Sequence, residues 1–124
     1  MSTIIATVAI VDDDESVRES LRELLRAADF NALTFASAEE YVTRADAANI
    51  DCMIVDVNLP GMNGVALART VWARGDATPV VLITARDDNV TLSLIQSVAG
   101  APVLRKPFTD DALFDAIRHV MSKE

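Results

Sequence analysis

The sequence predicts an α/β fold, in which a five-stranded parallel sheet is doubly wound by five helices. Two patterns lead to this prediction. Short continuous apolar runs, typical of strands buried on both faces, alternate with longer segments of helical periodicity. The connections between them are short and contain no repeat or linker, so right-handed crossovers favour the strand order 2-1-3-4-5. We therefore expect residues 1–124 to form one domain.

The first half of the chain contains two strand–helix units. Residues 6–11 form an apolar run that predicts a strand, and residues 15–28 have helical periodicity after Asp14, a suitable N-cap. A second strand is expected over 32–35. The next helix begins with a capping box and is expected to reach about Ala47. The capping box consists of Ser37 and Glu40. The apolar face of the first helix consists of Val17, Leu21, Leu24, Leu25 and Ala28.

The third strand–helix unit contains a long turn-rich loop. An apolar run from Cys52 to Val55 predicts the strand, which ends at Asp56. Residues 57–64 are dense in turn-forming residues. A helix is expected over about 65–73, and we expect its Trp72 to be packed.

The last two units follow the same scheme. The fourth strand ends at Thr84, and a helix is expected over about 88–98. A short strand begins at Val103, and Thr109 or Asp110 caps the last helix. The apolar positions of the helix over about 88–98 are Val90, Leu94, Ile95 and Val98. Those of the last helix are Leu113, Ala116, Ile117 and Val120.

Composition excludes some classes of partner. Eleven basic and 19 acidic residues give a net charge of −8, so the domain is a poor binder of nucleic acid, whose phosphates need a basic surface. The single cysteine, Cys52, cannot form an intrachain disulfide, which fits a reducing compartment. We expect this cysteine to be a small buried hydrophobe.

The N-terminal segment does not resemble a targeting signal. The apolar stretch over residues 4–11 is short, has no basic residue before it, and runs into four consecutive acids. No apolar stretch approaches the length of a membrane span. We therefore expect a cytoplasmic location and no membrane partner.

Chemically competent polar residues stand where the predicted strands end. Asp12 and Asp13 follow the first strand, Asp56 ends the third, Thr84 the fourth, and Lys106 follows the fifth. Parallel strands end on one edge of the sheet, and ligands bind at this edge in open α/β sheets. Clustered carboxylates repel one another unless they share a proton or bind a divalent cation, and an all-oxygen set suits Mg²⁺.

These residue types match the needs of phosphoryl transfer. An aspartate can act as a nucleophile and form an aspartyl-phosphate. The charge on the phosphoryl oxygens must then be neutralised by a metal, a lysine and a hydroxyl or amide donor. Asp12 with Asp13, Lys106 and Thr84 would supply these groups, and Asp56 would take the phosphoryl group.

The chain resembles the receiver domains of two-component response regulators over nearly its whole length, which implies their flavodoxin-like fold. Each matching segment is weak alone, but together they occur in the family's order, each at a strand end. Residues 13–15 and 37–40 are most similar to the nitrogen-fixation branch of transcriptional receivers. The matching segments are Ile10-Val11-Asp12-Asp13, Ile54 to Gly64, Leu82-Ile83-Thr84-Ala85 and Lys106-Pro107-Phe108.

The resemblance implies a phosphoacceptor and a magnesium site. A sensor histidine kinase or a phosphotransfer protein would phosphorylate Asp56. Asp13 and Asp56 would ligate Mg²⁺ directly, and Asp12 would act mainly through a bound water. The backbone carbonyl of Asn58 would be the third protein ligand.

The resemblance also implies roles for two further residues. Thr84 would hydrogen-bond the phosphoryl group and swing inward on activation. Lys106 would pair with a phosphate oxygen, and its peptide bond to Pro107 is expected to be cis, a minority state that needs structural support.

Two departures from the family pattern concern the fifth strand. Many receivers carry an aromatic residue three positions before the lysine, and this chain has Val103 there. The glycine–alanine pair that precedes the strand, Gly100-Ala101, lies one residue closer to the lysine and is followed by Pro102. We expect phosphorylation chemistry to survive both changes, whereas transmission through the last two helices is less secure.

Two other functions stay open. A phosphatase of the haloacid-dehalogenase kind also uses an aspartyl nucleophile, but it places an acid two residues later, where this chain has Asn58, and it needs room for a cap domain. A pseudo-receiver would act only as a protein-interaction module. This alternative stays open because Val103 stands where many receivers have the aromatic residue of the switch. A receiver is not a conventional metabolic enzyme, because it catalyses only its own phosphorylation and dephosphorylation.

The resemblance implies partners as well as a kinase. An output domain or a downstream protein would receive the signal, and phosphorylation could drive homodimerisation through the face of the fourth helix, fifth strand and fifth helix. We expect no direct nucleic-acid binding. The one histidine, His119, stands late in the last helix and is expected to be solvated, so it is not an internal phosphodonor.

Overall fold

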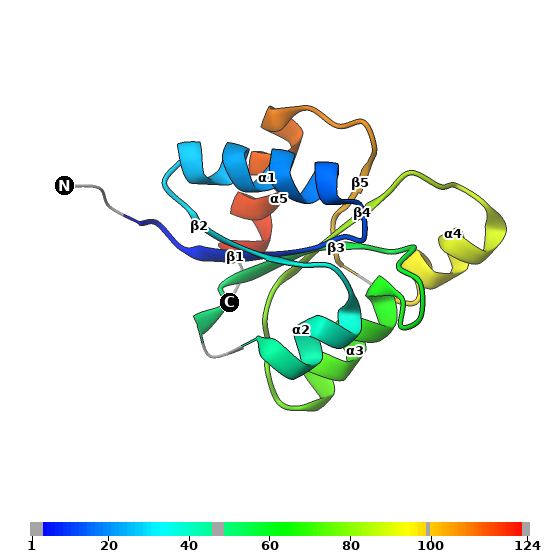
Figure 1. Cartoon of the computed structure of the whole chain (residues 1–124). Coiled ribbons are helices and arrows are strands. Elements are labelled where there is room, and N and C mark those ends of the chain that lie inside the picture. Colours follow the sequence, from blue (N-terminus) through cyan, green and yellow to red (C-terminus); the bar gives the residue numbers. More distant parts are fainter. Residues whose placement is uncertain (1–3, 46–48, 99, 123–124) are drawn as a thin grey trace.

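The computed structural model describes residues 4–45, 49–98 and 100–122 and confirms the α/β fold (Figure 1). All strand pairs are parallel, and the order β2-β1-β3-β4-β5 is the one predicted. The strands are β1 (Thr7–Val11), β2 (Asn31–Phe35), β3 (Cys52–Asp56), β4 (Val80–Thr84) and β5 (Val103–Arg105). The helices are α1 (Glu15–Ala27), α2 (Ala38–Arg44), α3 (Gly64–Ala73), α4 (Asn89–Gln96) and α5 (Asp110–Met121).

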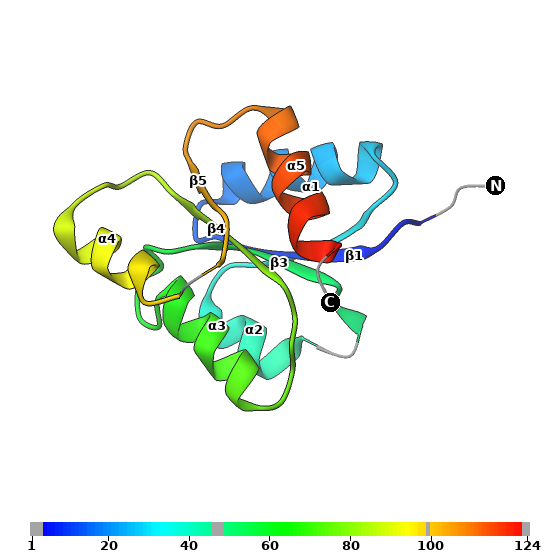
Figure 2. The same cartoon turned by 180° about the vertical axis from the view of Figure 1, so that it is seen from behind.

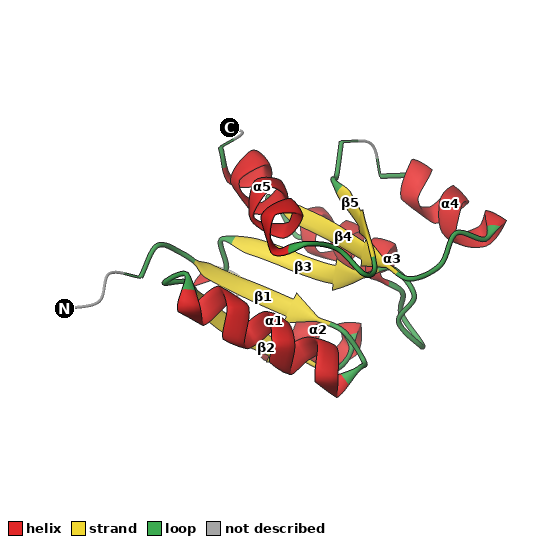
Figure 3. Cartoon of the chain, turned by 90° about the horizontal axis from the view of Figure 1, so that it is seen from above, coloured by secondary structure: helices red, strands yellow, loops and turns green. Residues whose placement is uncertain are grey.

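The sheet separates two hydrophobic layers. Helices α1 and α5 cover one face, and α2 and α3 cover the other, as the front and back views show (Figures 1 and 2). Alternate residues of each strand point to opposite faces, so Val8 and Ile10 enter one layer while Ala9 and Val11 enter the other. This double burial explains why the strands are continuous apolar runs. Seen from above, the strands run side by side and end at one edge (Figure 3).

Side chains cap the amino termini of the helices. Asp14 accepts the N–H groups of Ser16 and Val17, and Thr109 caps α5 by accepting the N–H of Ala112, as predicted. At α2, Ser37 accepts the N–H of Glu40, but the Glu40 carboxylate accepts the N–H of Ala36 rather than that of Ser37. The capping box is therefore displaced by one residue on its acidic side.

Helices α2 and α4 each differ from the prediction in one respect. Helix α2 ends at Arg44, because Ala45 has an extended backbone; the predicted end at Ala47 lies outside the described residues. In α4 the predicted apolar position Val90 is 72% exposed, whereas Thr91 is 1% exposed. Thr91 therefore takes the first inward position of α4 in place of Val90, because its hydroxyl has a polar partner in the interior, while Leu94, Ile95 and Val98 face the core as predicted.

The predicted apolar faces of α1 and α5 are confirmed in large part: Val17 and Leu24 of α1 are partly buried, and Ala28 is outside the core. Leu21 and Leu25 of α1 and the apolar stripe of α5 are buried, and Cys52 is a buried free thiol whose pKa burial raises to about 12. His119 is exposed, as expected. None of the helices in the described ranges combines the length and apolar character that crossing a bilayer requires.

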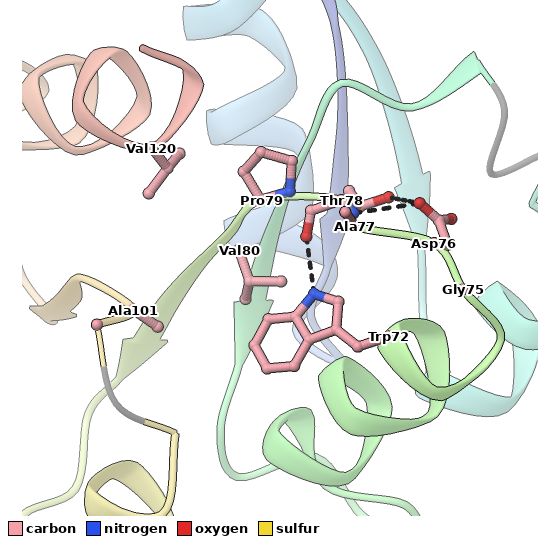
Figure 4. Close-up of a pocket in the computed structure, with 10 residues that line it drawn as sticks. Trp72, Gly75, Asp76, Ala77, Thr78, Pro79, Val80, Ala101 and Val120 are labelled. Atoms are coloured by element: carbon pink, nitrogen blue, oxygen red, sulfur yellow. Dashed lines mark hydrogen bonds between the residues drawn. The ribbon is translucent and has the colours of Figure 1, made fainter. Parts of the chain in front are cut away.

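A pocket of about 530 Å³ opens at the amino-terminal edge of β4 and β5. Its wall includes the ring of Trp72, whose Nε1 donates to the carbonyl oxygen of Thr78 at 3.0 Å (Figure 4). Trp72 is 37% exposed, so it is only partly packed. This pocket lies at the opposite edge of the sheet from the strand ends that carry the predicted site.

Gly64 allows helix α3 to begin directly beneath the end of β3. A Cβ atom at this position would lie 2.3 Å from the backbone oxygen of Asp56 and 2.8 Å from Cγ1 of Val55. Its own N–H donates to the carbonyl of Val57 at 3.1 Å. A side chain here would push on the backbone of the predicted phosphoacceptor.

We expect Gly64→Ala to lower the free energy of unfolding by about 3 kcal/mol, the upper end of the range for overpacking a tight site. The matched control is Gly75→Ala: Gly75 has φ +84° but no atoms within 4 Å of an added Cβ. It should cost only about 1 kcal/mol, from backbone conformation alone. Urea unfolding measures both, and a Gly64→Ala protein as stable as the control would contradict the steric explanation.

Candidate functional site

Three carboxylates meet at the carboxyl edge of the sheet. One oxygen each from Asp12, Asp13 and Asp56 can be chosen so that all lie within 4.8 Å of one another. Asp12 is fully buried, Asp56 is 6% exposed and Asp13 is exposed. They lie together because β1 and β3 are neighbours at the point where the strand order of the sheet reverses. The predicted clustering of the three carboxylates is therefore present in the structure.

Lys106 bridges the two buried carboxylates. Its Nζ lies 2.9 Å from Oδ2 of Asp12 and 2.8 Å from Oδ2 of Asp56. The lysine is positioned by its backbone N–H, which donates to the carbonyl of Thr84 at 2.8 Å. Its peptide bond to Pro107 is cis, as expected.

The electrostatics of the cluster are unbalanced. Burial raises the pKa of Asp12, although the hydrogen bond from Lys106 opposes the rise. Burial alone would lower the pKa of Lys106, but its hydrogen bonds to Asp56 and Asp12 outweigh that effect and raise it. With Asp13 in the same cluster, three carboxyl groups face one ammonium group, and a divalent cation would relieve the repulsion among them.

Backbone donors fix the orientation of the two buried carboxylates. Oδ1 of Asp56 accepts the N–H of Asn58 at 2.8 Å, and Oδ1 of Asp12 accepts the N–H of Asp14 at 2.9 Å. In both cases the loop after the strand turns back on the strand-end aspartate. Lys106 contacts the other oxygen of each, so neither carboxylate is free to rotate.

Thr84 lies at the same edge, but its hydroxyl is engaged elsewhere. The side chain is fully buried, and Oγ1 donates to Oδ1 of Asn58 at 2.6 Å while accepting the N–H of Arg86 at 3.0 Å. Among the hydrogen bonds of the described residues, none joins Thr84 to Asp56. The structure therefore brings together Asp12, Asp13, Asp56 and Lys106, with Thr84 held one step away through Asn58.

Sequence reasoning missed two residues around the site. Arg18 stands on the polar side of α1, yet its Nη1 donates to the carbonyl of Asp12 at 2.8 Å. Thr91 accepts the side-chain amide of Asn58 at 2.9 Å. Arg18 could have been found from the sequence, because it lies in the first turn of the helix that follows Asp12 after a short turn. Nothing in the sequence distinguishes Thr91 from any other threonine within a helix.

Comparison with known proteins agrees with this geometry. The family model "Response regulator receiver domain" matches residues 8–118. The chain is 32% identical over 111 residues to the transcriptional regulatory protein FixJ of Azorhizobium caulinodans, covering 90% of this chain and 53% of that protein. It is 30% identical over 119 residues to the response regulator protein TodT of Pseudomonas putida, covering 95% and 52%. The chain thus spans about half the length of these curated relatives.

Solved structures of receivers have the same fold. The structure titled FixJ-N superposes with a TM-score of 0.83 at 30% identity, covering 98% of each chain. The chemotaxis protein CheY4 of Vibrio cholerae superposes with a TM-score of 0.82 at 28% identity, covering 95% of this chain and 99% of that one. Together with the family match over residues 8–118, these similarities show that the chain belongs to the response regulator receiver domains of two-component signalling systems.

Proposed function

We propose that this receiver domain accepts a phosphoryl group on Asp56, with Mg²⁺ bound by the acidic cluster, and then switches a partner or output domain. The observation that carries the proposal is the bridge from Lys106 to Asp12 and Asp56 beside the exposed Asp13. It combines a nucleophile, a metal-ligating pair and a cation for a phosphoryl oxygen in one place.

The transfer itself follows from these groups. An oxygen of Asp56 attacks the phosphorus of a phosphohistidine, forming a P–O bond as the P–N bond breaks and the histidine nitrogen leaves with its electron pair. Lys106 then balances the charge of a phosphoryl oxygen, and the Thr84 hydroxyl can donate to another. The single histidine of this sequence, His119, is an exposed residue of α5 and is not the proposed donor, so the phosphohistidine belongs to a different domain.

The donor set fits magnesium. Carboxylates of Asp12, Asp13 and Asp56 and the backbone carbonyl of Asn58 are hard oxygen ligands, and the excess negative charge of the cluster favours a divalent cation. When bound, Mg²⁺ would neutralise negative charge on the phosphoryl group and on the acceptor carboxylate. By family resemblance, Asp12 would act through a bound water.

The proposed domain is a switch rather than a metabolic enzyme. In the phosphatase alternative an acid would stand at Asn58, but an amide cannot donate a proton as a general acid. Its side chain is also occupied by Thr84 and Thr91. The pseudo-receiver alternative predicts no response to a phosphate mimic, and this distinguishes it from the proposal.

The proposed partners follow from the family. A histidine kinase or phosphotransfer protein supplies the phosphoryl group in the cytoplasm, and an output domain or downstream protein receives the signal. The relatives FixJ and DctD, the latter from Rhizobium meliloti, carry the name of transcriptional regulatory proteins and are longer than this chain, which supports a transcriptional output.

We expect beryllium fluoride with Mg²⁺, a phosphoryl mimic, to shift the amide NMR signals of residues 56–58 and 84–86 in a saturable way. Asp56→Asn should abolish the shift, because the mimic needs the acceptor carboxylate. Trp72 fluorescence is a poorer probe, because Trp72 lies eight residues beyond Gly64 along α3, roughly 12 Å away.

Asp51→Asn is the matched control for this titration. Asp51 precedes β3 at the opposite edge of the sheet, where it accepts the N–H of Thr7, so its loss should leave binding intact. A folded wild-type protein that gives no shift would favour the pseudo-receiver. Sustained release of phosphate from p-nitrophenyl phosphate would favour the phosphatase.

Asp12→Asn should stabilise the metal-free protein by about 1 kcal/mol, as removal of a strained functional group often does. The pKa of Asp12 is higher in the folded than in the unfolded state, so its ionisation costs stability as pH rises through the folded pKa. The gain should therefore be present above the folded pKa of Asp12 and be lost in acid, where the wild-type carboxyl is protonated. Thermal unfolding should also show less stabilisation of the variant by Mg²⁺ than of the wild type.

The control for this experiment is Asp115→Asn. Asp115 is an exposed carboxylate on α5 that pairs with Arg118, and such a surface pair contributes little. Its loss should change neither stability nor the magnesium effect. A wild-type protein that gains no stability from Mg²⁺ would contradict the metal assignment.

Phosphorylation should also convert the chain from monomer to homodimer. Light scattering with and without beryllium fluoride and Mg²⁺ measures the mass directly, and Asp56→Asn should stay monomeric under both conditions. A mass that stays monomeric when the NMR titration is saturated would exclude dimerisation for this chain.

A further inference from the structure

A closed ring of hydrogen bonds connects the candidate site to helix α4. Thr84 donates to Oδ1 of Asn58 at 2.6 Å, and Nδ2 of Asn58 donates to Oγ1 of Thr91 at 2.9 Å. The backbone N–H of Thr91 donates to Oδ1 of Asp88 at 2.8 Å. Asp88 accepts Nε of Arg86 at 2.7 Å, and the N–H of Arg86 returns to Thr84.

The direction of each bond in the ring is determined by its chemistry. Asp88 is an ionised acceptor, whose pKa is lowered chiefly by the backbone N–H of Thr91 and also by the Thr91 hydroxyl and Arg86. The Thr91 oxygen accepts from the side-chain amide of Asn58 at 2.9 Å. The amide nitrogen of Asn58 then faces Thr91, and its oxygen faces Thr84.

This direction leaves Thr84 no spare donor. Its hydroxyl has one proton, which is given to Asn58 at 2.6 Å, with the Arg86 carbonyl as a second and longer acceptor contact at 3.3 Å. Its oxygen accepts the N–H of Arg86. A phosphoryl oxygen is an acceptor only, so it can gain this proton only if Asn58 loses it. Because the Asn58 amide is planar and rigid, a turn that releases Thr84 also moves the nitrogen bound to Thr91.

Helix α4 is suited to respond to that movement. Thr91 is 1% exposed and lies in the first turn of the helix, three residues after the N-cap Asp88. Loss of its bond to Asn58 would leave a buried hydroxyl with one partner fewer, which favours a shift of the helix terminus. Val103 stands where many receivers have an aromatic residue, so this chain has no aromatic side chain there that could change position when Thr84 moves.

We propose that Asn58 and Thr91 are positioning residues that hold the Thr84 hydroxyl away from Asp56 and transmit its release to helix α4. This inference rests on the proposed phosphorylation of Asp56. This ring of hydrogen bonds takes the place of the missing aromatic switch as the physical link between the phosphorylation site and helix α4.

The test is a titration with beryllium fluoride and Mg²⁺, read by amide NMR, on wild type and Thr91→Val. Valine has a similar shape but neither donates nor accepts, so it releases Asn58. We expect the midpoint to fall about fivefold, the effect of one hydrogen bond. The signals of residues 89–96 should no longer follow those of 84–86 in the variant, whereas in the wild type they move together.

Two further variants separate positioning from simple packing. Thr91→Ser retains the hydroxyl and should restore the wild-type midpoint and the response of α4. Thr70→Val makes the same chemical change on α3, where the hydroxyl donates to the carbonyl of Ala66 outside the ring, and should leave both unchanged. A Thr91→Val midpoint equal to that of Thr70→Val, or higher, would overturn the inference.

The wild-type protein provides an independent measurement if Thr91→Val does not fold. The side-chain amide protons of Asn58 should shift and lose protection from exchange at saturation, because they leave Thr91. Unchanged Asn58 protons together with shifted 84–86 signals would overturn the relay and leave the proposed function standing. Absence of any wild-type response would instead refute the proposed function, and the relay with it.

Discussion

One ammonium group, that of Lys106, contacts carboxylates at the ends of two strands other than its own. Lys106 follows β5, and it reaches past β4 to the ends of β3 and β1, which are 50 and 94 residues away in the chain. Partly buried charges of this kind are costly to desolvate, so their presence is weak evidence for stability. The proposed function offers a better explanation, since in it the same ammonium group that holds Asp56 would meet a phosphoryl oxygen.

The sheet makes that placement possible by separating rigid and adaptable parts. The central strands are buried on both faces, and their register fixes where each one ends. The functional groups lie just beyond those ends, in loops that turn back through Asx-type bonds at Asp12 and Asp56. Gly64 lets the start of α3 pack closely against the end of β3, so α3 supports the backbone of Asp56. Lys106 and the backbone N–H of Asn58 fix its side chain.

Most of the fold could be predicted because its signals are local. Period, run length and capping residues are properties of neighbouring positions, and they located the strands, the helix starts at Asp14 and Thr109, and the acidic edge. The failures depend on tertiary partners. Val90 was predicted to face inward by periodicity, yet Thr91 is buried instead because Asn58 supplies its hydrogen bond. The side chain of Asn58 was likewise unassigned, since its two partners lie 26 and 33 residues away.

The position of the Thr84 proton determines how such a site can act as a switch. A hydroxyl with one proton serves one acceptor at a time. In the proposed function, Thr84 therefore gives its proton either to a neighbour, Asn58 or the more distant Arg86 carbonyl, or to a phosphoryl oxygen. Burial sharpens the choice, because an unsatisfied acceptor in a water-excluded site costs about 1–3 kcal/mol. A difference of that size shifts a two-state equilibrium by roughly one to two orders of magnitude. The exchange of one buried hydrogen bond is therefore enough to bias the position of α4, without any rearrangement of the sheet that holds the carboxylates.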